Sequence, residues 1–144
     1  IMKSEYQDLD NIVLAMDEVQ TDPIILTYLI SHLLTRNSVF HQPRVGCVKC
    51  KSTGELVYPH SWIELPGGWT VDLRLNQAFN TFDRYPQGIF EPSSYRNLQY
   101  FGMPLTVPEF EPSELDEMTD FMFSKLFSVQ GLDIRVSGGC DDCI

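Results

Sequence analysis

The chain has 144 residues, of which 43% are hydrophobic, so it can bury one sizeable core but is short for two. Its 20 acidic residues outnumber its 10 basic residues, and the formal charge of −10 argues against nucleic acid or an anionic membrane surface as a partner. No apolar run is long enough for a transmembrane helix, and no secretory signal is visible. We therefore expect a cytoplasmic protein whose four cysteines are thiols or metal ligands before they are disulfides.

The first part of the chain, residues 1–36, is predicted to be helical. Residues 4–19 carry apolar side chains at helical spacing, as on a surface helix with one apolar stripe. In the following stretch Asp22 is a plausible N-cap, Pro23 stands at the first helical position, and apolar residues follow on nearly all sides. This second helix is therefore expected in the core.

The pattern changes to that of strands over residues 43–75. Two stretches rich in β-branched and aromatic residues, 43–50 and 55–65, are separated by the turn cluster KSTG, and a third, 69–75, alternates after PGG. These stretches predict a three-stranded antiparallel meander that packs on the preceding helix. The expected fold is α+β, with helices on one face of a small antiparallel sheet.

The rest of the chain completes one predicted domain, residues 1–144. Residues 76–112 are dense in aromatic residues and prolines without a sustained period, and are predicted to be a long loop over one face. Residues 113–127 begin with Ser113 as N-cap and continue with an amphipathic pattern, which predicts a third helix. Residues 113–144 are expected to end in a short strand, LDIRV, and a tail that contains two cysteines.

The hairpin HSWIELPGGWTVDL brings a histidine and an aspartate to one face. A three-residue PGG connection, in which a glycine supplies the left-handed residue, pairs Glu64 with Thr70 and Trp62 with Asp72. His60 and Asp72 are then diagonal neighbours about 7–8 Å apart, within reach of a side-chain hydrogen bond. A carboxylate beside a histidine fixes its tautomer and stabilises the imidazolium, as a general base for a nucleophile requires. The alternative is that this face is exposed to solvent and its charged residues only form cross-strand pairs.

The order of a buried helix, an R-V-G strand, H-S-W-I-E-L and W-T-V-D-L resembles the transglutaminase-like branch of papain-fold cysteine enzymes. That branch includes arylamine N-acetyltransferases and peptide-processing proteases. The matching positions are His60, Trp62, Glu64, Val71 and Asp72. The resemblance implies a hydrolase or acyltransferase acting on a peptide or small acyl substrate. A thiolate attacks the carbonyl, His60 relays the proton and Asp72 orients His60, while Trp62 and Glu64 lie at the substrate.

The nucleophile of that family, a cysteine at the N-terminus of the buried helix, has no counterpart in VQTDPIILTY. Cys47 on the neighbouring strand is the best candidate for the missing thiol. If no thiol serves His60, the chain is a non-catalytic relative that acts as a protein-binding module. Two classes of function therefore stay open, a thiol-dependent enzyme without a cofactor and a module that binds a partner protein.

The cysteines also support a separate hypothesis, a zinc-stapled structural domain. They stand in two C-x-x-C pairs, Cys47 with Cys50 and Cys140 with Cys143. Four thiolates in two such pairs make a tetrahedral zinc site, although the pairs are usually separated by only about 15 to 20 residues. Within a regular strand Cys47 and Cys50 would point to opposite faces, so zinc binding requires a turn there. The alternative is that Cys47 is a small buried apolar residue and CDDC is a free tail.

Overall fold

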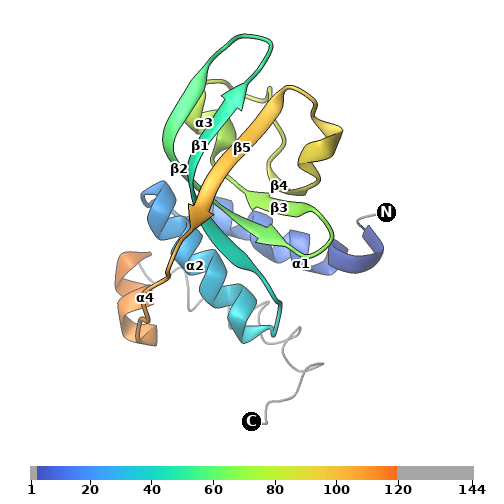
Figure 1. Cartoon of the computed structure of the whole chain (residues 1–144). Coiled ribbons are helices and arrows are strands. Elements are labelled where there is room, and N and C mark those ends of the chain that lie inside the picture. Colours follow the sequence, from blue (N-terminus) through green and yellow to red (C-terminus); the bar gives the residue numbers. More distant parts are fainter. Residues whose placement is uncertain (1–2, 120–144) are drawn as a thin grey trace.

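The computed structural model describes residues 3–119, which form an antiparallel sheet with helices around it (Figure 1). The sheet has five strands in the order β4-β3-β2-β1-β5. The strands are β1 (Gln42–Cys50), β2 (Leu56–Leu65), β3 (Trp69–Asp72), β4 (Gly88–Phe90) and β5 (Leu98–Pro104). The α-helices are α1 (Lys3–Ala15), α2 (Pro23–Arg36), α3 (Leu75–Ala78) and α4 (Pro112–Met118). Two short 3-10 helices are η1 (Met16–Glu18) and η2 (Pro92–Ser94).

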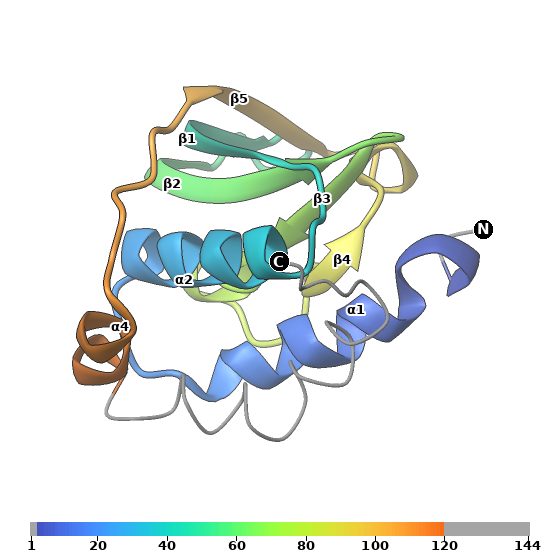
Figure 2. The same cartoon turned by 90° about the horizontal axis from the view of Figure 1, so that it is seen from below.

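The two long helices, α1 and α2, lie on one side of β1, β2 and β5, as Figure 2 shows. As predicted, α2 follows the N-cap residue Asp22, with Pro23 in its first turn. Apolar side chains from both helices, β2 and β3 build the main core, which includes Ile12, Val13, Met16, Leu29, Leu33, Leu34, Ile63, Leu65 and Val71. Burial of each large aliphatic side chain contributes about 1.5–3 kcal/mol. The predicted α+β class with an antiparallel sheet is confirmed.

The predicted meander is confirmed, because β1 pairs with β2 and β2 pairs with β3, both antiparallel. The hairpin register is also the predicted one, with Glu64 opposite Thr70 and Leu65 opposite Trp69. Gly67 and Gly68 have φ angles of 86° and 83°, the left-handed conformation that the PGG connection requires.

The prediction of one long loop over 76–112 is wrong, since this segment contains η2 and two further strands. Strand β4 pairs with β3, and β5 crosses the sheet to pair with β1. The sequence signal for β5 is weak because it contains Gly102 and Pro104, residue types that strands avoid. Gly102 has a packing reason, since a Cβ there would lie 2.6 Å from two ring atoms of Trp62. The sheet is therefore larger than the predicted three strands.

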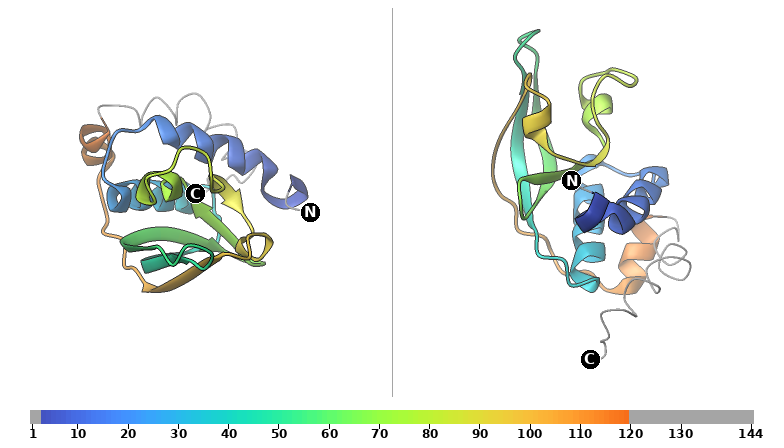
Figure 3. Two further views of the ribbon diagram at one scale, coloured as in Figure 1. Left: turned by 90° about the horizontal axis from the view of Figure 1, so that it is seen from above. Right: turned by 90° about the vertical axis from the view of Figure 1, so that its right-hand side faces the viewer.

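A second apolar cluster occupies the face of β2 that carries Trp62, opposite to the face of Ile63. Its buried members are Val48, Cys50, Trp62, Leu75, Phe79, Phe90 and Leu98. Leu75 belongs to α3, which Figure 3 (right) shows beside the upper part of the sheet, above α1 and α2. The alternative that this face is exposed to solvent is therefore wrong, because side chains from the segment after β3 cover it.

The third predicted helix is present in part. Helix α4 begins one residue before Ser113, and its N-cap is Glu111, whose backbone N–H donates to the Glu114 carboxylate at 2.7 Å. The remainder of that predicted helix, the short strand and Cys140 and Cys143 lie outside the described residues. Within residues 3–119, no helix combines the length and the apolar character needed to cross a membrane.

Candidate functional site

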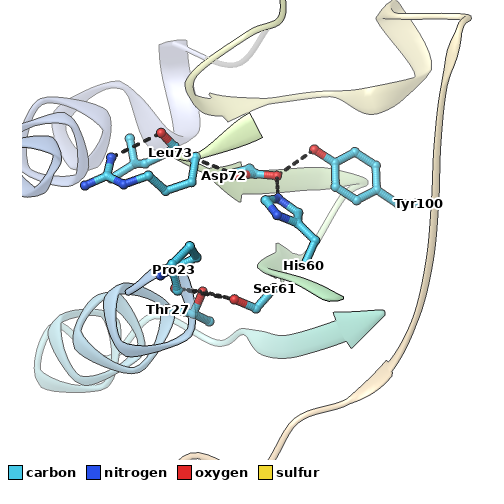
Figure 4. A network of polar contacts seen from close by, with 8 residues as sticks. Pro23, Thr27, His60, Ser61, Asp72, Leu73 and Tyr100 are labelled. Carbon is cyan, nitrogen blue, oxygen red and sulfur yellow. Dashed lines mark hydrogen bonds and ion pairs between the residues drawn. The ribbon is translucent and has the colours of Figure 1, made fainter. Parts of the chain in front are cut away.

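The predicted His60–Asp72 pair is formed, as Figure 4 shows. Nε2 of His60 donates to Oδ2 of Asp72 at 2.7 Å, and each residue is only 3% exposed. The pair joins the middle of β2 to the end of β3, so the PGG register places both side chains on one face. Because the acceptor is a carboxylate, the contact assigns the proton between them to Nε2 and leaves Nδ1 as the second nitrogen of the ring.

The Asp72 carboxylate has two further hydrogen-bond donors. The Tyr100 hydroxyl donates to Oδ2 at 2.9 Å, and the Arg74 backbone N–H donates to Oδ1 at 3.0 Å. Burial, followed by the negative charge of Asp72, raises the pKa of the Tyr100 phenol well above its ordinary value. Tyr100 therefore stays protonated and remains a donor. Sequence reasoning missed this residue, which reaches the pair from β5 at the far edge of the sheet.

The Trp62 ring packs against two members of this network, His60 and Tyr100. It stacks on that of His60 with centroids 6.1 Å apart, and meets Tyr100 edge-on at 4.8 Å. Gly102 provides the space for this packing, since a Cβ there would lie 2.6 Å from the Trp62 ring, and Gly46 lets β1 and β5 approach each other closely. Trp62 is buried and stacks on His60, so its role in the structure is to hold the His60 ring in position.

The predicted substrate residue Glu64 lies two positions further along β2 and is not part of the buried network. Its Oε1 accepts from Nε of Arg44 at 3.1 Å, and its side chain is 45% exposed. This exposed ion pair contributes little to stability.

His60 also lines a pocket of about 380 Å³ beside the N-terminus of α2. Pro23, in the first turn of that helix, lines the same pocket, together with Val57, Tyr58, Pro59, Gln77 and Ala78. Nδ1 of His60 has no hydrogen-bond partner anywhere in the described part of the chain. Nδ1 is therefore the ring nitrogen that no described protein group occupies. Arg74 lines the pocket too, but its guanidinium binds Asp17 and the carbonyl of Val19.

The described residues that line this pocket include no cysteine, serine or threonine, and their only hydroxyl is that of Tyr58. The hydroxyl of Thr27 is 2.8 Å from that of Ser61 and donates to the Pro23 carbonyl at 3.1 Å. Ser61 follows His60 in β2 and therefore points to the opposite face, toward α2. These hydroxyls tie the helix to the sheet.

The structure does not bring Cys47 to the pair. Cys47 lies at a β-bulge, where Tyr58 and Pro59 of β2 stand between the partners of Gly46 and Val48. It lines a separate apolar pocket of about 340 Å³ with Tyr58, Phe101 and Met103. Strand alternation explains this placement, because Gly46 is the partner of His60 and the next residue faces the other way. The assignment of Cys47 as the thiol activated by His60 is therefore corrected.

Cys50 is buried in the second apolar cluster, on the face opposite to Cys47. Hydroxyl groups of Ser52, Thr53 and Tyr85 lower the pKa of its thiol to about 6. In this arrangement one tetrahedral metal ion cannot coordinate the thiolates of both Cys47 and Cys50, because the sheet lies between them. Within residues 3–119, no group of three His, Cys, Asp or Glu side chains could hold a metal ion. The zinc hypothesis also involves Cys140 and Cys143, and for those two it stays a prediction.

The other two histidines make structural contacts. His41 uses both ring nitrogens, at 2.7 Å from the Ser31 hydroxyl and 2.7 Å from the Val39 carbonyl. His32 lies 3.1 Å from the Pro108 carbonyl through Nε2. His60 differs from His41 in having one nitrogen on a carboxylate and the other directed at no protein partner.

Comparison with known proteins identified no relative of this chain. No protein-family model, no curated protein and no solved structure matches the chain. The candidate site therefore rests on the geometry of His60, Asp72 and Tyr100 and on the pocket beside α2.

Proposed function

We propose that the chain is a transglutaminase-like hydrolase or acyltransferase in which His60, oriented by Asp72, is the general base. The observation that carries the proposal is the buried 2.7 Å contact between these residues next to a pocket that also contains Pro23 at the start of α2. The family that the sequence resembles has its reacting group at this helix end. The substrate class is an amide, peptide or small acyl compound.

The tautomer determines the direction of proton transfer. The Nε2–H group of His60 stays hydrogen-bonded to the Asp72 carboxylate, so Nδ1 accepts the proton of a nucleophile bound in the pocket. As the nucleophile attacks the carbonyl carbon, its proton moves to Nδ1, and Nδ1 returns that proton to the leaving amine when the C–N bond breaks. Asp72 stabilises the positive charge on the ring between these steps. We assign the nucleophile to water or to a thiol of a bound ligand, because neither Cys47 nor Cys50 lines this pocket.

A second candidate function is a non-catalytic module that binds a peptide or a partner protein. Pro23 favours it, because it stands in the first turn of α2, where the resembled family has its cysteine. A pyrrolidine ring offers neither a thiol nor a hydroxyl. In such a module His60 would form a hydrogen bond to the ligand without transferring a proton.

The experiment compares hydrolysis of p-nitrophenyl acetate and of a peptide thioester by the purified chain and its variants. We expect His60→Gln and Asp72→Asn each to lower the rate by about 10²–10⁴, the usual contribution of a positioned general base. His41→Gln is the matched control, since this imidazole is hydrogen-bonded at both nitrogens, and its rate should equal that of the wild type. Circular dichroism confirms that each variant is folded.

Two outcomes decide between the candidates. Equal rates for the wild type and His60→Gln contradict the proposed base. If acetylated peptides shift the NMR signals of the His60 ring without being hydrolysed, the binding module is the better description.

A further inference from the structure

Strand β5 is an edge of the sheet, and large apolar side chains beside it face solvent. Figure 2 shows β5 at the margin farthest from α1. Phe101 is 52% exposed, Met103 is 65% exposed, and Tyr58 of β2 is 74% exposed. The three side chains line the apolar pocket that also contains Cys47. Strand β5 itself, LQYFGMP, contains no charged residue, although charges are a common protection of edge strands.

The free backbone groups of this edge follow from its pairing with β1. The Asn97 carbonyl accepts from Lys51 and the Leu105 N–H donates to Pro43, so odd-numbered residues of β5 direct their backbone groups to β1. In an antiparallel ladder the even-numbered residues then direct theirs outward. Tyr100 and Gly102 therefore present free N–H and C=O groups at the edge, with no partner in the described part of the chain.

The two ends of the edge lack free donors for different reasons. The Leu98 N–H is occupied by the Tyr95 carbonyl at 2.9 Å, and Pro104 has no N–H. The free backbone N–H groups of the edge are thus arranged symmetrically about Phe101, with Tyr100 on one side and Gly102 on the other.

We infer that β5 is the interface of a homodimer, in which two copies pair antiparallel about a two-fold axis at Phe101. In this register Tyr100 exchanges both backbone hydrogen bonds with Gly102 of the second copy, and the reverse pair does the same. Leu98 lies opposite Pro104 of the second copy, so neither copy leaves a free N–H unpaired there. The two Phe101 side chains meet on the exposed face. The product is one continuous sheet across both copies.

Charge also favours a second copy in this orientation. The exposed basic residues Lys49, Lys51 and Arg96 lie near the start of β5, since Lys49 pairs with Gln99 and Lys51 bonds to Asn97. The exposed acids Glu109 and Glu111 follow its end, where the chain continues toward α4 (Figure 1). Antiparallel pairing brings the basic end of each copy to the acidic end of the other.

The first experiment is sedimentation velocity of the full chain over a range of concentrations. The expected result is a dimer with twice the chain mass of 16.5 kDa. Phe101→Lys places like charges directly opposite each other across the axis, so the dimer should dissociate at concentrations at which the wild type is dimeric. Phe82→Lys is the matched control, because Phe82 is 92% exposed and lies outside the edge, and this variant should remain dimeric.

The second experiment tests the register by disulfide formation in a Cys47→Ser, Cys140→Ser, Cys143→Ser background. In the proposed pairing the Cα atoms of the two Phe101 residues are about 4.5 Å apart, so Phe101→Cys should form a covalent dimer under mild oxidation. Gln99→Cys should not, because Gln99 lies opposite Met103 of the second copy, four residues away from its own equivalent.

Three results overturn the inference. One is a wild type that stays monomeric at high concentration, whether the edge is free or is covered by another protein or by residues 120–144. Another is a dimer unaffected by Phe101→Lys, which would use a different surface. The third is equal crosslinking of Phe101→Cys and Gln99→Cys, which would exclude the proposed register. If Phe101→Lys does not fold, Met103→Lys provides the same charge at the edge.

Discussion

Removal of the Tyr100 hydroxyl tests the hydrogen-bond network around Asp72. In Tyr100→Phe, the ring still packs on Trp62, and only the 2.9 Å bond to the carboxylate is lost. A hydrogen bond to a charged group contributes about 1.5–3 kcal/mol, so the free energy of unfolding should fall by that amount. For a domain of this size the midpoint of thermal unfolding should decrease by about 4 °C per kcal/mol, or about 6–12 °C in total.

The pH dependence of this effect has a definite sign. Burial and the charge of Asp72 raise the pKa of Tyr100 in the folded state, whereas the unfolded phenol ionises near its ordinary value of about 10. The stabilisation is therefore complete below pH 10 and is lost as the pH rises above it, because unfolding then releases a proton. The stability difference between the wild type and Tyr100→Phe should therefore shrink as the pH rises from 8 to 11.

Urea unfolding followed by circular dichroism at several pH values measures both effects. Tyr58→Phe is the matched control, because Tyr58 is 74% exposed and its hydroxyl has no hydrogen bond among the described residues. A Tyr100→Phe variant within about 0.5 kcal/mol of the wild type, the usual range of neutral surface substitutions, would refute the role of Tyr100 in holding Asp72.

Two further predictions concern the pocket and the packing behind it. Pro23→Cys places a thiol at the N-terminus of α2 beside His60, where the helix dipole and the imidazole favour the thiolate, so its alkylation by iodoacetamide should be fast and should slow in a His60→Gln background. Peptide mass spectrometry measures both rates, and equal rates would show that His60 does not reach the new thiol. Gly102→Ala adds a Cβ 2.6 Å from Trp62, so it should cost about 1–3 kcal/mol and change the fluorescence of Trp62. Unchanged stability would show that Trp62 has room to move.

The hairpin could be predicted from the sequence because its chemistry is local. The PGG connection supplies left-handed positions at Gly67 and Gly68, the loop length determines the register, and the register determines which side chains share a face. The contact between His60 and Asp72 could therefore be predicted without knowledge of the rest of the fold.

Tyr100 could not be predicted in this way. Its contact depends on the pairing of β5 with β1, which joins segments far apart in the sequence, and the weak strand pattern of β5 gives no sign of that pairing. The glycine that weakens the pattern is required by Trp62, which lies two strands away. Both facts come from one non-local packing arrangement.

Cys47 shows a different limit of sequence reasoning. Its proximity to His60 along the sheet is real, since its neighbour Gly46 is the partner of His60. The face on which a strand residue lies changes with every position, and the bulge opposite Tyr58 and Pro59 also shifts the register beyond it. The position of Cys47 and His60 on paired strands therefore did not mean that their side chains share a site.

The His60–Asp72 contact is difficult to explain by stability alone. Replacing both partners of a buried hydrogen bond by apolar groups of the same shape can be nearly neutral or stabilising. The surrounding cluster already closes this face with apolar residues such as Val48 and Leu98. Of the two structural histidines, His41 has both ring nitrogens hydrogen-bonded to the protein, and His32 contacts Pro108 through Nε2. His60 instead has Nε2 fixed on a carboxylate and lines a pocket, and this arrangement is the basis of the proton transfer that we propose.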